Sequence, residues 1–415
     1  MRLLDGALRS YAWGSRTALA ELCGRPSPSA HPEAELWFGA HPADPAWVSC
    51  GERRTSLLDL IADDPEGQLG PSVVPRFGKR LPFLIKLLAA EEPLSLQAHP
   101  SAAQAREGFE RENRARVPMD APVRNYKDES AKPEVVVALE PFDALAGFRD
   151  PHTTVALLRG LDVRALDTYV ALLDGQPDAS GLRALFTTWI TLPPPALASL
   201  LDDVLDGCVR YLSGGDSRFT AEVQTALELA AAYPNDAGVL ASLLLNRVHL
   251  RPGESIHLAA GNLHAYLHGV AVEVMANSDN VLRGGLTPKH VDVPELLRVL
   301  DFEPTPMTAC RSVPAAQGCG GRYLADVDEF ALTCLELDDA QPVRIPADGL
   351  PAIMVCTSGA VELAWAADAP TDPGRAGAGA VCLDRGSAAW ISASDPDIVV
   401  TAQVAPAQIF HVTVG

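Results

Sequence analysis

The first 150 residues consist of short apolar runs separated by glycine, proline and aspartate. Runs such as ELWFGAHP, LPFLIKLL and PEVVVALEPFDALAGFR have the length of β-strands and end in turn-forming residues. From about residue 151 to 246 the pattern changes to Leu- and Ala-rich segments with helical spacing, such as LASLLDDVLDGCVRYL. Pro193, Pro194 and Pro195 separate two of these segments, because proline does not continue a helix. We therefore expect strands followed by a helical segment.

Strand patterns return at Val248 and continue to the end of the chain. The segment VHLRPGESIHLAAGNLHAYLHGVAVEVMANSDN predicts several strands with His268 at a turn, and VPELLRVLDF predicts a helix. EPTPMTACRSVP has the composition of a linker, and beyond about residue 318 runs such as AIMVCTSGAVELAW predict a second antiparallel set of strands. The expected fold class is therefore mainly β with a helical insert.

Composition and charge narrow the possible classes of protein. Hydrophobic residues make up 47% of the 415 positions and charged residues 21%, which suits a chain with a sizeable buried core. A formal charge of −20 argues against nucleic acid or an anionic membrane as the main partner. The N-terminal residues lack the apolar core of a signal peptide, and Lys86 interrupts the longest early apolar stretch. We expect a cytoplasmic protein.

Two segments contain candidate metal ligands. In PLSLQAHP, residues two apart share a strand face, so Ser95, Gln97 and His99 point one way and the apolar residues point the other. An amide carbonyl beside an imidazole nitrogen offers two ligands to a divalent metal. Glu134 begins the apolar strand EVVVAL, where a buried carboxylate needs a metal or Lys132 as its partner. Each segment alone also fits a half-exposed strand or loop.

Two later segments extend this set. After Gly261, the sequence NLHAYLH places His264 and Tyr266 on one strand face, which makes His264 a candidate for the same metal or a structural core histidine. Glu273 interrupts an apolar strand and could act as acid or base, or orient a ligand. The SDN loop then leads to Arg283 before two glycines, where a guanidinium and backbone N–H groups could hold a phosphate. The alternative is that Arg283 is a solvent-exposed residue of a turn and binds no phosphate.

These motifs together resemble one family. LPFLIK, PLSLQAHP, NYKDESAKPE, GNLHAYLHG and EVMANSDNVLRGGLTPK occur in the order typical of the type I mannose-6-phosphate isomerases, zinc-dependent members of the cupin superfamily. YAWGS near Trp13, AELWFGAHP around Glu35 and Trp37, and ALAGFR ending at Arg149 add to the resemblance. It extends to about Phe302 and is weak in the C-terminal region.

The resemblance implies a domain layout. A cupin (jelly-roll) β-barrel catalytic domain is expected from residues 1–150 together with 247–305, and an α-helical insert domain from residues 151–246. Residues 306–415 are expected to form a second jelly-roll domain that lacks the metal ligands. We also expect a monomer whose partner is a small sugar phosphate rather than nucleic acid or a membrane.

The resemblance also implies the residues of the site. One Zn²⁺ per chain would be held by Gln97, His99, Glu134 and His264, although this donor set also suits manganese, iron or cobalt. The remaining residues are the catalytic candidates Arg283, Lys132 and Glu273 and the substrate-binding candidates Lys86, Ser95, Tyr266 and Asp279. One departure is Ala131, where family members often have a histidine. A mechanism that gives this histidine a proton to transfer does not apply here unchanged.

The reaction implied by the resemblance interconverts D-mannose 6-phosphate and D-fructose 6-phosphate through an enediol(ate). Glu273 and Lys132 are both candidates for the base, since burial can raise the pKa of a glutamate and nearby cations can lower that of a lysine. A different metal-dependent cupin enzyme, such as an oxygenase, is one alternative, but a coordinating glutamine argues against it. A catalytically silent sugar-phosphate sensor is another, but all four ligand positions are intact.

Overall fold

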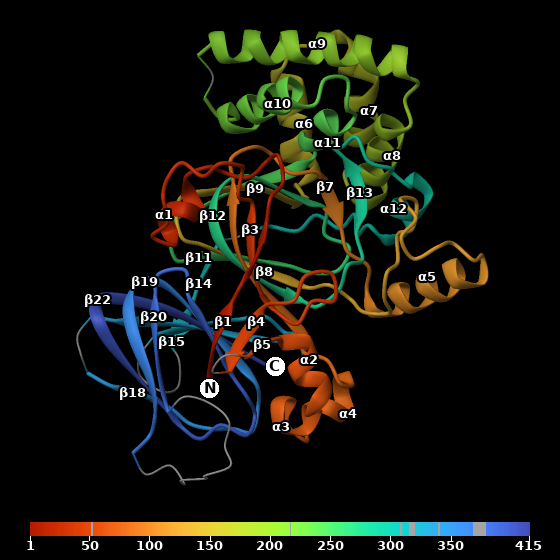
Figure 1. The fold of residues 1–415 in the computed structure, drawn as a ribbon. Coiled ribbons are helices and arrows are strands. Elements are labelled where there is room, and N and C mark those ends of the chain that lie inside the picture. Colours follow the sequence, from red (N-terminus) through yellow and green to blue (C-terminus); the bar gives the residue numbers. More distant parts are fainter. Residues whose placement is uncertain (51–52, 216, 308, 315–319, 339–340, 368–378) are drawn as a thin grey trace.

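The structure of the chain is a computed structural model that describes residues 1–50, 53–215, 217–307, 309–314, 320–338, 341–367 and 379–415. The described residues form two antiparallel sheets of eleven strands each, with a group of helices above the first sheet (Figure 1). The expected fold class, mainly β with helices between the strands, is confirmed at this level.

The first sheet, which we call the site sheet, is organised around its longest strand, β12 (His264–Ala276). Its first residues pair with β7 and β9, whereas its second half, from Gly269, pairs with β6 and β8. Gly269 has a φ of 122°, and a Cβ there would lie 2.4 Å from the carbonyl oxygen of Pro141, so this position, where β12 changes partner strands, requires glycine. His268, which we expected at a turn, lies inside β12 beside this glycine. The other strands are β2 (Ala7–Arg9), β3 (Glu35–Gly39), β6 (Phe83–Ala90), β7 (Leu96–Ala98), β8 (Glu134–Ala138), β9 (Phe142–Phe148), β10 (Leu245–Leu250), β11 (Glu254–Leu258), β13 (Leu282–Gly285) and β14 (Cys310–Arg311).

The second sheet, which we call the C-terminal sheet, contains strands from both ends of the chain. Its strands are β1 (Arg2–Asp5), β4 (Trp47–Cys50), β5 (Arg53–Ser56), β15 (Val313–Pro314), β16 (Gly321–Tyr323), β17 (Ala331–Leu337), β18 (Val343–Ile345), β19 (Ala352–Trp365), β20 (Ala380–Asp384), β21 (Ala388–Ile391) and β22 (Ile398–Thr413). β1 pairs with β21, where Arg2 lies opposite Trp390. The sheets therefore do not divide near residue 306 as expected, because β1, β4 and β5 belong to the C-terminal sheet.

The helices fall into two groups. Helices α6 to α11 all lie within residues 151–246, and α9 begins at Pro194, where a proline is compatible with the first helical turn. Helices α1 to α5 lie among the first strands and were not expected; α5 is polar and begins with a capping box between Ser101 and Gln104. The bounds are α1 (Ala18–Leu22), α2 (Leu57–Asp63), α3 (Pro65–Leu69), α4 (Val73–Phe77), α5 (Ala102–Arg114), α6 (Pro151–Gly160), the 3-10 helix Arg164–Leu166, α7 (Asp167–Gly175), α8 (Ala179–Ile190), α9 (Pro194–Ser213), α10 (Thr220–Ala232), α11 (Gly238–Ser242) and the expected α12 (Val293–Val299).

Apolar packing joins these parts. Phe38, Ile85 and Val272 of the site sheet share one buried cluster with Val355 and Phe410 of the C-terminal sheet. A separate buried cluster connects the helices α6 to α11 with β7, β9 and β13. The site sheet is therefore packed on one side by the C-terminal sheet and on another by helices, which restricts movement of the strands that carry the site.

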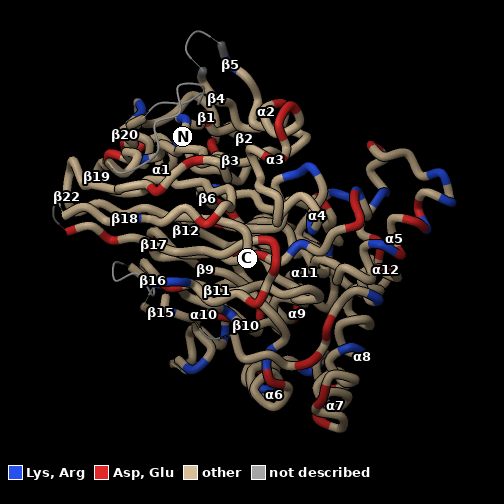
Figure 2. The backbone as a smooth tube through the Cα atoms, turned by 90° about the horizontal axis from the view of Figure 1, so that it is seen from below, with Lys and Arg blue, Asp and Glu red and all other residues tan. Residues whose placement is uncertain are grey.

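The apolar character of the helices and the distribution of charge bear on possible partners. No single helix in the described part of the chain is long and apolar enough to cross a membrane; α8 and α9 meet this criterion only as a pair with a 112° bend between them. Lys and Arg positions are interspersed with Asp and Glu over the molecule, as along α5 (Figure 2).

His411 provides a test of the packing at the C-terminal sheet. It lines a small cavity together with Asp348, Met354 and Thr413. Burial lowers the pKa of His411 to about 4, and the carboxylate of Asp348 opposes this shift only in part. Since a histidine in the unfolded chain gains its proton near pH 6.5, stability is lost as the pH falls from about 6.5 to about 4, by at most about 3 kcal/mol. We expect His411→Gln to remove this loss, measured by urea unfolding across that pH range.

The control is His31→Gln, because His31 is exposed. It should leave the pH dependence of stability unchanged. An identical pH dependence in the His411→Gln variant and the unsubstituted protein would show that His411 is not protected from protonation in the folded chain.

Candidate metal centre

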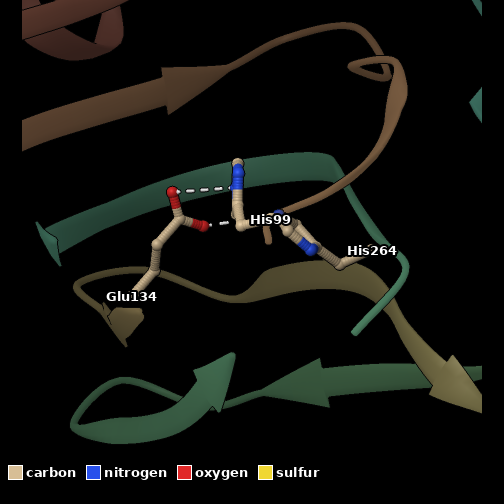
Figure 3. Close-up of side chains that lie close together, drawn as sticks. All are labelled: His99, Glu134 and His264. Atoms are coloured by element: carbon tan, nitrogen blue, oxygen red, sulfur yellow. Dashed lines mark ion pairs between the residues drawn. The ribbon is translucent and has the colours of Figure 1, made fainter. Parts of the chain in front are cut away.

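Three side chains from separate strands converge at one buried point. His99 follows β7, Glu134 begins β8 and His264 begins β12 (Figure 3). The distance is 3.2 Å from His99 Nε2 to Glu134 Oε1 and 3.3 Å from His264 Nε2 to Glu134 Oε2. The candidate ligand atoms of all three residues lie within 4.8 Å of one another. Both Nε2 atoms and Glu134 Oε2 are buried without a hydrogen-bond partner in the described part of the structure, and a divalent cation would satisfy all three.

The second nitrogen of each histidine is held by a backbone carbonyl. His99 Nδ1 lies 2.8 Å from the carbonyl oxygen of Asn280, and His264 Nδ1 lies 3.0 Å from that of Asn262. Because a carbonyl can only accept, both rings carry their proton on Nδ1 and direct the lone pair of Nε2 towards the shared point. This arrangement is typical of metal-binding histidines.

The protonation states of these groups also suit a metal. Burial lowers the pKa of His99 to about 4, so its ring is neutral near pH 7. Burial would raise the pKa of Glu134, but His99, Lys132 and His264 outweigh this effect and hold that pKa well below its usual range. A neutral imidazole and an ionised carboxylate are the forms that bind a divalent cation.

Gln97 lies beside this group. On β7 it pairs with His264 of β12 and with Arg283 of β13. Directly paired residues on antiparallel strands share a face, so Gln97 faces the same side as both neighbours. Burial alternates as expected from Ser95 to Ala98, since Leu96 and Ala98 are buried whereas Ser95 and Gln97 are half-buried; His99, just beyond the end of β7, is buried as well. The amide oxygen of Gln97 stays the candidate for a fourth ligand.

A second buried cluster is centred on Lys86. Its Nζ lies 2.7 Å from Glu273 Oε2 and 3.3 Å from Glu35 Oε1. The other oxygens of these carboxylates accept from Tyr266 Oη at 2.6 Å and from Trp37 Nε1 at 2.9 Å. Strand register produces this arrangement, because Lys86 of β6 pairs with Glu273 of β12 on one side and with Trp37 of β3 on the other.

The Lys86 cluster fixes the charge of its members. Burial would lower the pKa of Lys86, but the charges of Glu273, Glu35 and Glu134 raise it above its usual range. Burial and the charge of Glu273 raise the pKa of Tyr266 well above its usual range. Lys86 is therefore a permanent cation and Tyr266 a permanent hydrogen-bond donor, and neither can serve as a base near neutral pH.

Lys132 and Asp279 lie at the edge of both clusters. Lys132 Nζ lies 3.6 Å from Glu134 Oε1, and Asp279 Oδ1 lies 3.2 Å from His41 Nε2. Burial would raise the pKa of Asp279, but His41, Lys132 and Lys86 together lower it. The influence of both lysines on Asp279 places its half-exposed carboxylate beside the same buried charges.

Arg283 differs from these residues because its guanidinium is not neutralised by a neighbouring side chain. It is half-buried on β13 and forms neither an ion pair nor a side-chain hydrogen bond within the described residues. Burial lowers the pKa of Arg283, and burial together with the charge of Arg283 lowers the pKa of Lys289. Two neighbouring cations that are not neutralised by the described chain leave positive charge for an anionic ligand.

Several residues of the site were missed or left without a role by sequence reasoning. Glu35, Trp37 and His41 were noticed only within the motif ELWFGAHP, although a glutamate in an apolar strand is the same signal that drew attention to Glu273. The role of Asn280 was missed because asparagine in a polar loop resembles an ordinary turn residue.

The fold and the site define a metal-binding protein with a buried cluster of paired charges, and comparison with known proteins identifies its family. Residues 1–151 match the phosphomannose isomerase type I catalytic domain. Mannose-6-phosphate isomerase of Escherichia coli (strain K12) is 39% identical over 412 residues, covering 99% of this chain and 100% of the relative. The human mannose-6-phosphate isomerase is 33% identical over 319 residues, covering 73% of each chain. The chain belongs to the type I phosphomannose isomerases and is an isomerase.

Solved structures agree with this assignment. The crystal structure of the Salmonella typhimurium enzyme bound to its substrate, fructose 6-phosphate, and to zinc has a TM-score of 0.87 and 36% sequence identity, covering 100% of this chain and 99% of that chain. A mannose 6-phosphate isomerase structure bound with zinc and yttrium has a TM-score of 0.86 at 36% identity, with the same coverage. The likeness therefore includes the C-terminal region, where the sequence motifs were weak.

Replacing Lys86 with methionine tests the buried charge cluster. The variant leaves Glu35 and Glu273 as buried carboxylates without their cation. Removing one partner of a buried ion pair typically costs about 3–5 kcal/mol, and we expect a loss of that order in the free energy of unfolding in urea near pH 7.

Lys79→Met is the matched control, because Lys79 is exposed and its loss should cost less than about 1 kcal/mol. Adding Glu35→Gln to Lys86→Met should recover part of the stability. Equal losses in the Lys79 and Lys86 variants would contradict the energetic coupling within the cluster.

Proposed function

We propose that this chain interconverts mannose 6-phosphate and fructose 6-phosphate with one zinc ion held by Gln97, His99, Glu134 and His264. The isomerase activity follows from membership of the family. The observation that carries the metal assignment is the convergence of two imidazole lone pairs and one carboxylate, all buried and unsatisfied by the described chain. Zinc suits this nitrogen and oxygen donor set, and when bound it supplies positive charge beside the oxyanion that forms on the substrate.

The reaction needs a base that moves a proton between neighbouring carbons of the sugar through an enediol(ate). We assign this role to Glu273. A carboxylate offers about four lone-pair sites; Tyr266 donates to one oxygen and Lys86 is ion-paired with the other, which leaves acceptor capacity for a carbon-bound proton. Lys132, beside Glu134, then donates a hydrogen bond to the developing oxyanion. With Ala131 in place of an imidazole, no proton transfer is assigned to that position.

The other end of the substrate carries the phosphate. Arg283 is the cation that supports this assignment best, because its fork of donors is not used by any described residue. Lys289 lies close enough for its pKa to respond to Arg283 and adds charge on the solvent side. Asp279, Ser95 and Tyr266 are assigned to the sugar hydroxyls.

The domain layout also belongs to this proposal. Residues 1–150, apart from β1, β4 and β5, form a cupin catalytic domain together with residues 247–305; residues 151–246 form a helical insert and residues 306–415 a C-terminal jelly roll. The change of β12 from one set of partner strands to another supports the first unit, and helices α6 to α11 support the second. The strands β1, β4 and β5 extend the third unit into the N-terminal region. The monomeric state, the cytoplasmic location and the lack of nucleic-acid or membrane partners stay predictions.

Metal removal is the most direct test of the function. Purified protein should convert mannose 6-phosphate to fructose 6-phosphate, lose this activity on chelation and regain it when zinc is added back. His264→Ala should lose metal and activity together, since it removes one of the ligands. A folded, zinc-loaded protein without turnover would contradict the isomerase activity, and a His264→Ala variant with stoichiometric zinc would contradict the ligand assignment.

The proposed roles of Glu273, Lys132 and Arg283 predict different defects at full zinc occupancy. Glu273→Gln retains an acceptor for Lys86 but cannot take a proton, so exchange of the substrate C2 hydrogen with deuterium from solvent should fall at least about 100-fold. In the Lys132→Met variant, turnover and hydrogen exchange should slow by factors equal to each other. NMR in D₂O measures the exchange, and rapid exchange in Glu273→Gln with none in Lys132→Met would transfer the base role to Lys132.

Arg283→Ala should keep its metal and lose most of kcat/KM.

A further inference from the structure

Asn280 connects two loops behind the metal centre. It lies between β12 and β13, and its side chain is fully buried. Its Oδ1 accepts from the backbone N–H groups of Lys127 at 2.7 Å and Asp128 at 3.2 Å. Its Nδ2 donates to the carbonyl oxygens of Asp128 and Ser130, each at 2.9 Å. Both functional atoms of this amide are therefore used to hold the segment 127–130.

Asp128 holds the opposite loop in return. Its carboxylate accepts from Ser278 Oγ at 2.9 and 3.0 Å and from the backbone N–H of Asp279 at 3.0 Å. Asn280 Nδ2 also lies 3.2 Å from Asp128 Oδ1. We call Asp128, Ser278 and Asn280 the clasp. It joins two segments about 150 residues apart in the sequence through side-chain and backbone contacts in both directions.

The clasp lies directly behind two of the three convergent ligands. The carbonyl oxygen of Asn280 accepts from His99 Nδ1, and so determines the tautomer and direction of that ring. The segment held by Asn280 continues within a few residues into Lys132 and Glu134. His99 and Glu134 come from different strands, yet one buried residue is connected to both. Asn280 contacts the His99 ring through its backbone carbonyl and holds the segment before Glu134 through its side-chain amide.

We propose that Asn280 and Asp128 are positioning residues that set the placement of His99 relative to Glu134 and Lys132, and thereby the affinity of the metal centre. The inference rests on the ligand assignment proposed above. Neither residue touches a candidate ligand with its side chain, and both act through the backbone that supports His99 and Glu134. Removal of such an outer partner typically costs 10- to 100-fold in metal affinity or activity, and we expect an effect of that size.

Asn280→Asp is the primary test. The new carboxylate oxygen replaces Nδ2 opposite three acceptors, namely Asp128 O, Asp128 Oδ1 and Ser130 O, so the clasp is repelled rather than held. The zinc dissociation constant, measured by competition with a chromophoric chelator, should rise about 10- to 100-fold. The visible spectrum of the cobalt-substituted protein should change as well, because it reports the ligand geometry. Adding Asp128→Asn, which removes one of the repelling charges, should restore part of the affinity.

Asn277→Asp is the matched control, three residues away in the same loop. Its Nδ2 donates to the carbonyl oxygens of Ala40 and Leu81 and to neither segment of the clasp. We expect this variant to lose stability while keeping its zinc affinity within about twofold, because it leaves the outer partners of the ligands in place. Equal zinc affinity and equal cobalt spectra in the Asn277 and Asn280 variants would overturn the proposal and reduce the clasp to a structural feature.

Two further variants keep the test decisive. If Asn280→Asp does not fold, Asp128→Asn alone should weaken zinc binding at least about threefold, and unchanged affinity would overturn the proposal. His99→Ala must lose zinc in the same assay. If it does not, the ligand assignment of the proposed function fails, which is a different result from failure of the clasp.

Discussion

The site depends on the cost of burying charge. An isolated carboxylate or ammonium in a protein interior costs several kcal/mol, so it persists only with partners. Backbone pairing supplies these partners here. Lys86 lies opposite Glu273 because β6 and β12 are neighbours in register, and Glu35 reaches the same lysine from β3. A slip of one residue would turn every one of these side chains to the other face of the sheet, where apolar packing would oppose them. The strand register therefore places opposite charges side by side, and the pairing of these charges in turn stabilises the register.

Strand β12 links this charge cluster to the metal centre. His264 lies before Gly269 and Glu273 after it, so one strand contributes to both groups while pairing with different neighbours on each side. Tyr266 connects them, since its ring centroid lies 6.0 Å from that of His264 and its hydroxyl donates to Glu273. The metal ligands and the assigned base are thus held on a single rigid element, which favours fixed distances between them.

Sequence reasoning succeeded where local periodicity carries the information. The polar alternation that singled out His99 and the acidic residues inside apolar strands, Glu134 and Glu273, marked positions that the structure brings into the two clusters. It failed where the deciding contact is distant. No local signal shows that β1 pairs with β21, or that Asn280 holds a segment about 150 residues earlier in the chain. The polar helix α5 was missed because it is stabilised by its capping box and by charged side chains one helical turn apart, and not by an apolar stripe.

The balance of buried charge links metal binding to substrate binding. The two buried clusters together contain three carboxylates, Glu35, Glu134 and Glu273, against two lysines, Lys86 and Lys132. These five groups carry one net negative charge, which opposes a phosphate ester that is itself an anion. A divalent cation reverses that sign, so the same ion that neutralises Glu134 makes the site attractive to the substrate. Substrate affinity is therefore coupled to metal occupancy through electrostatics alone, before any contact between the metal and the sugar is considered.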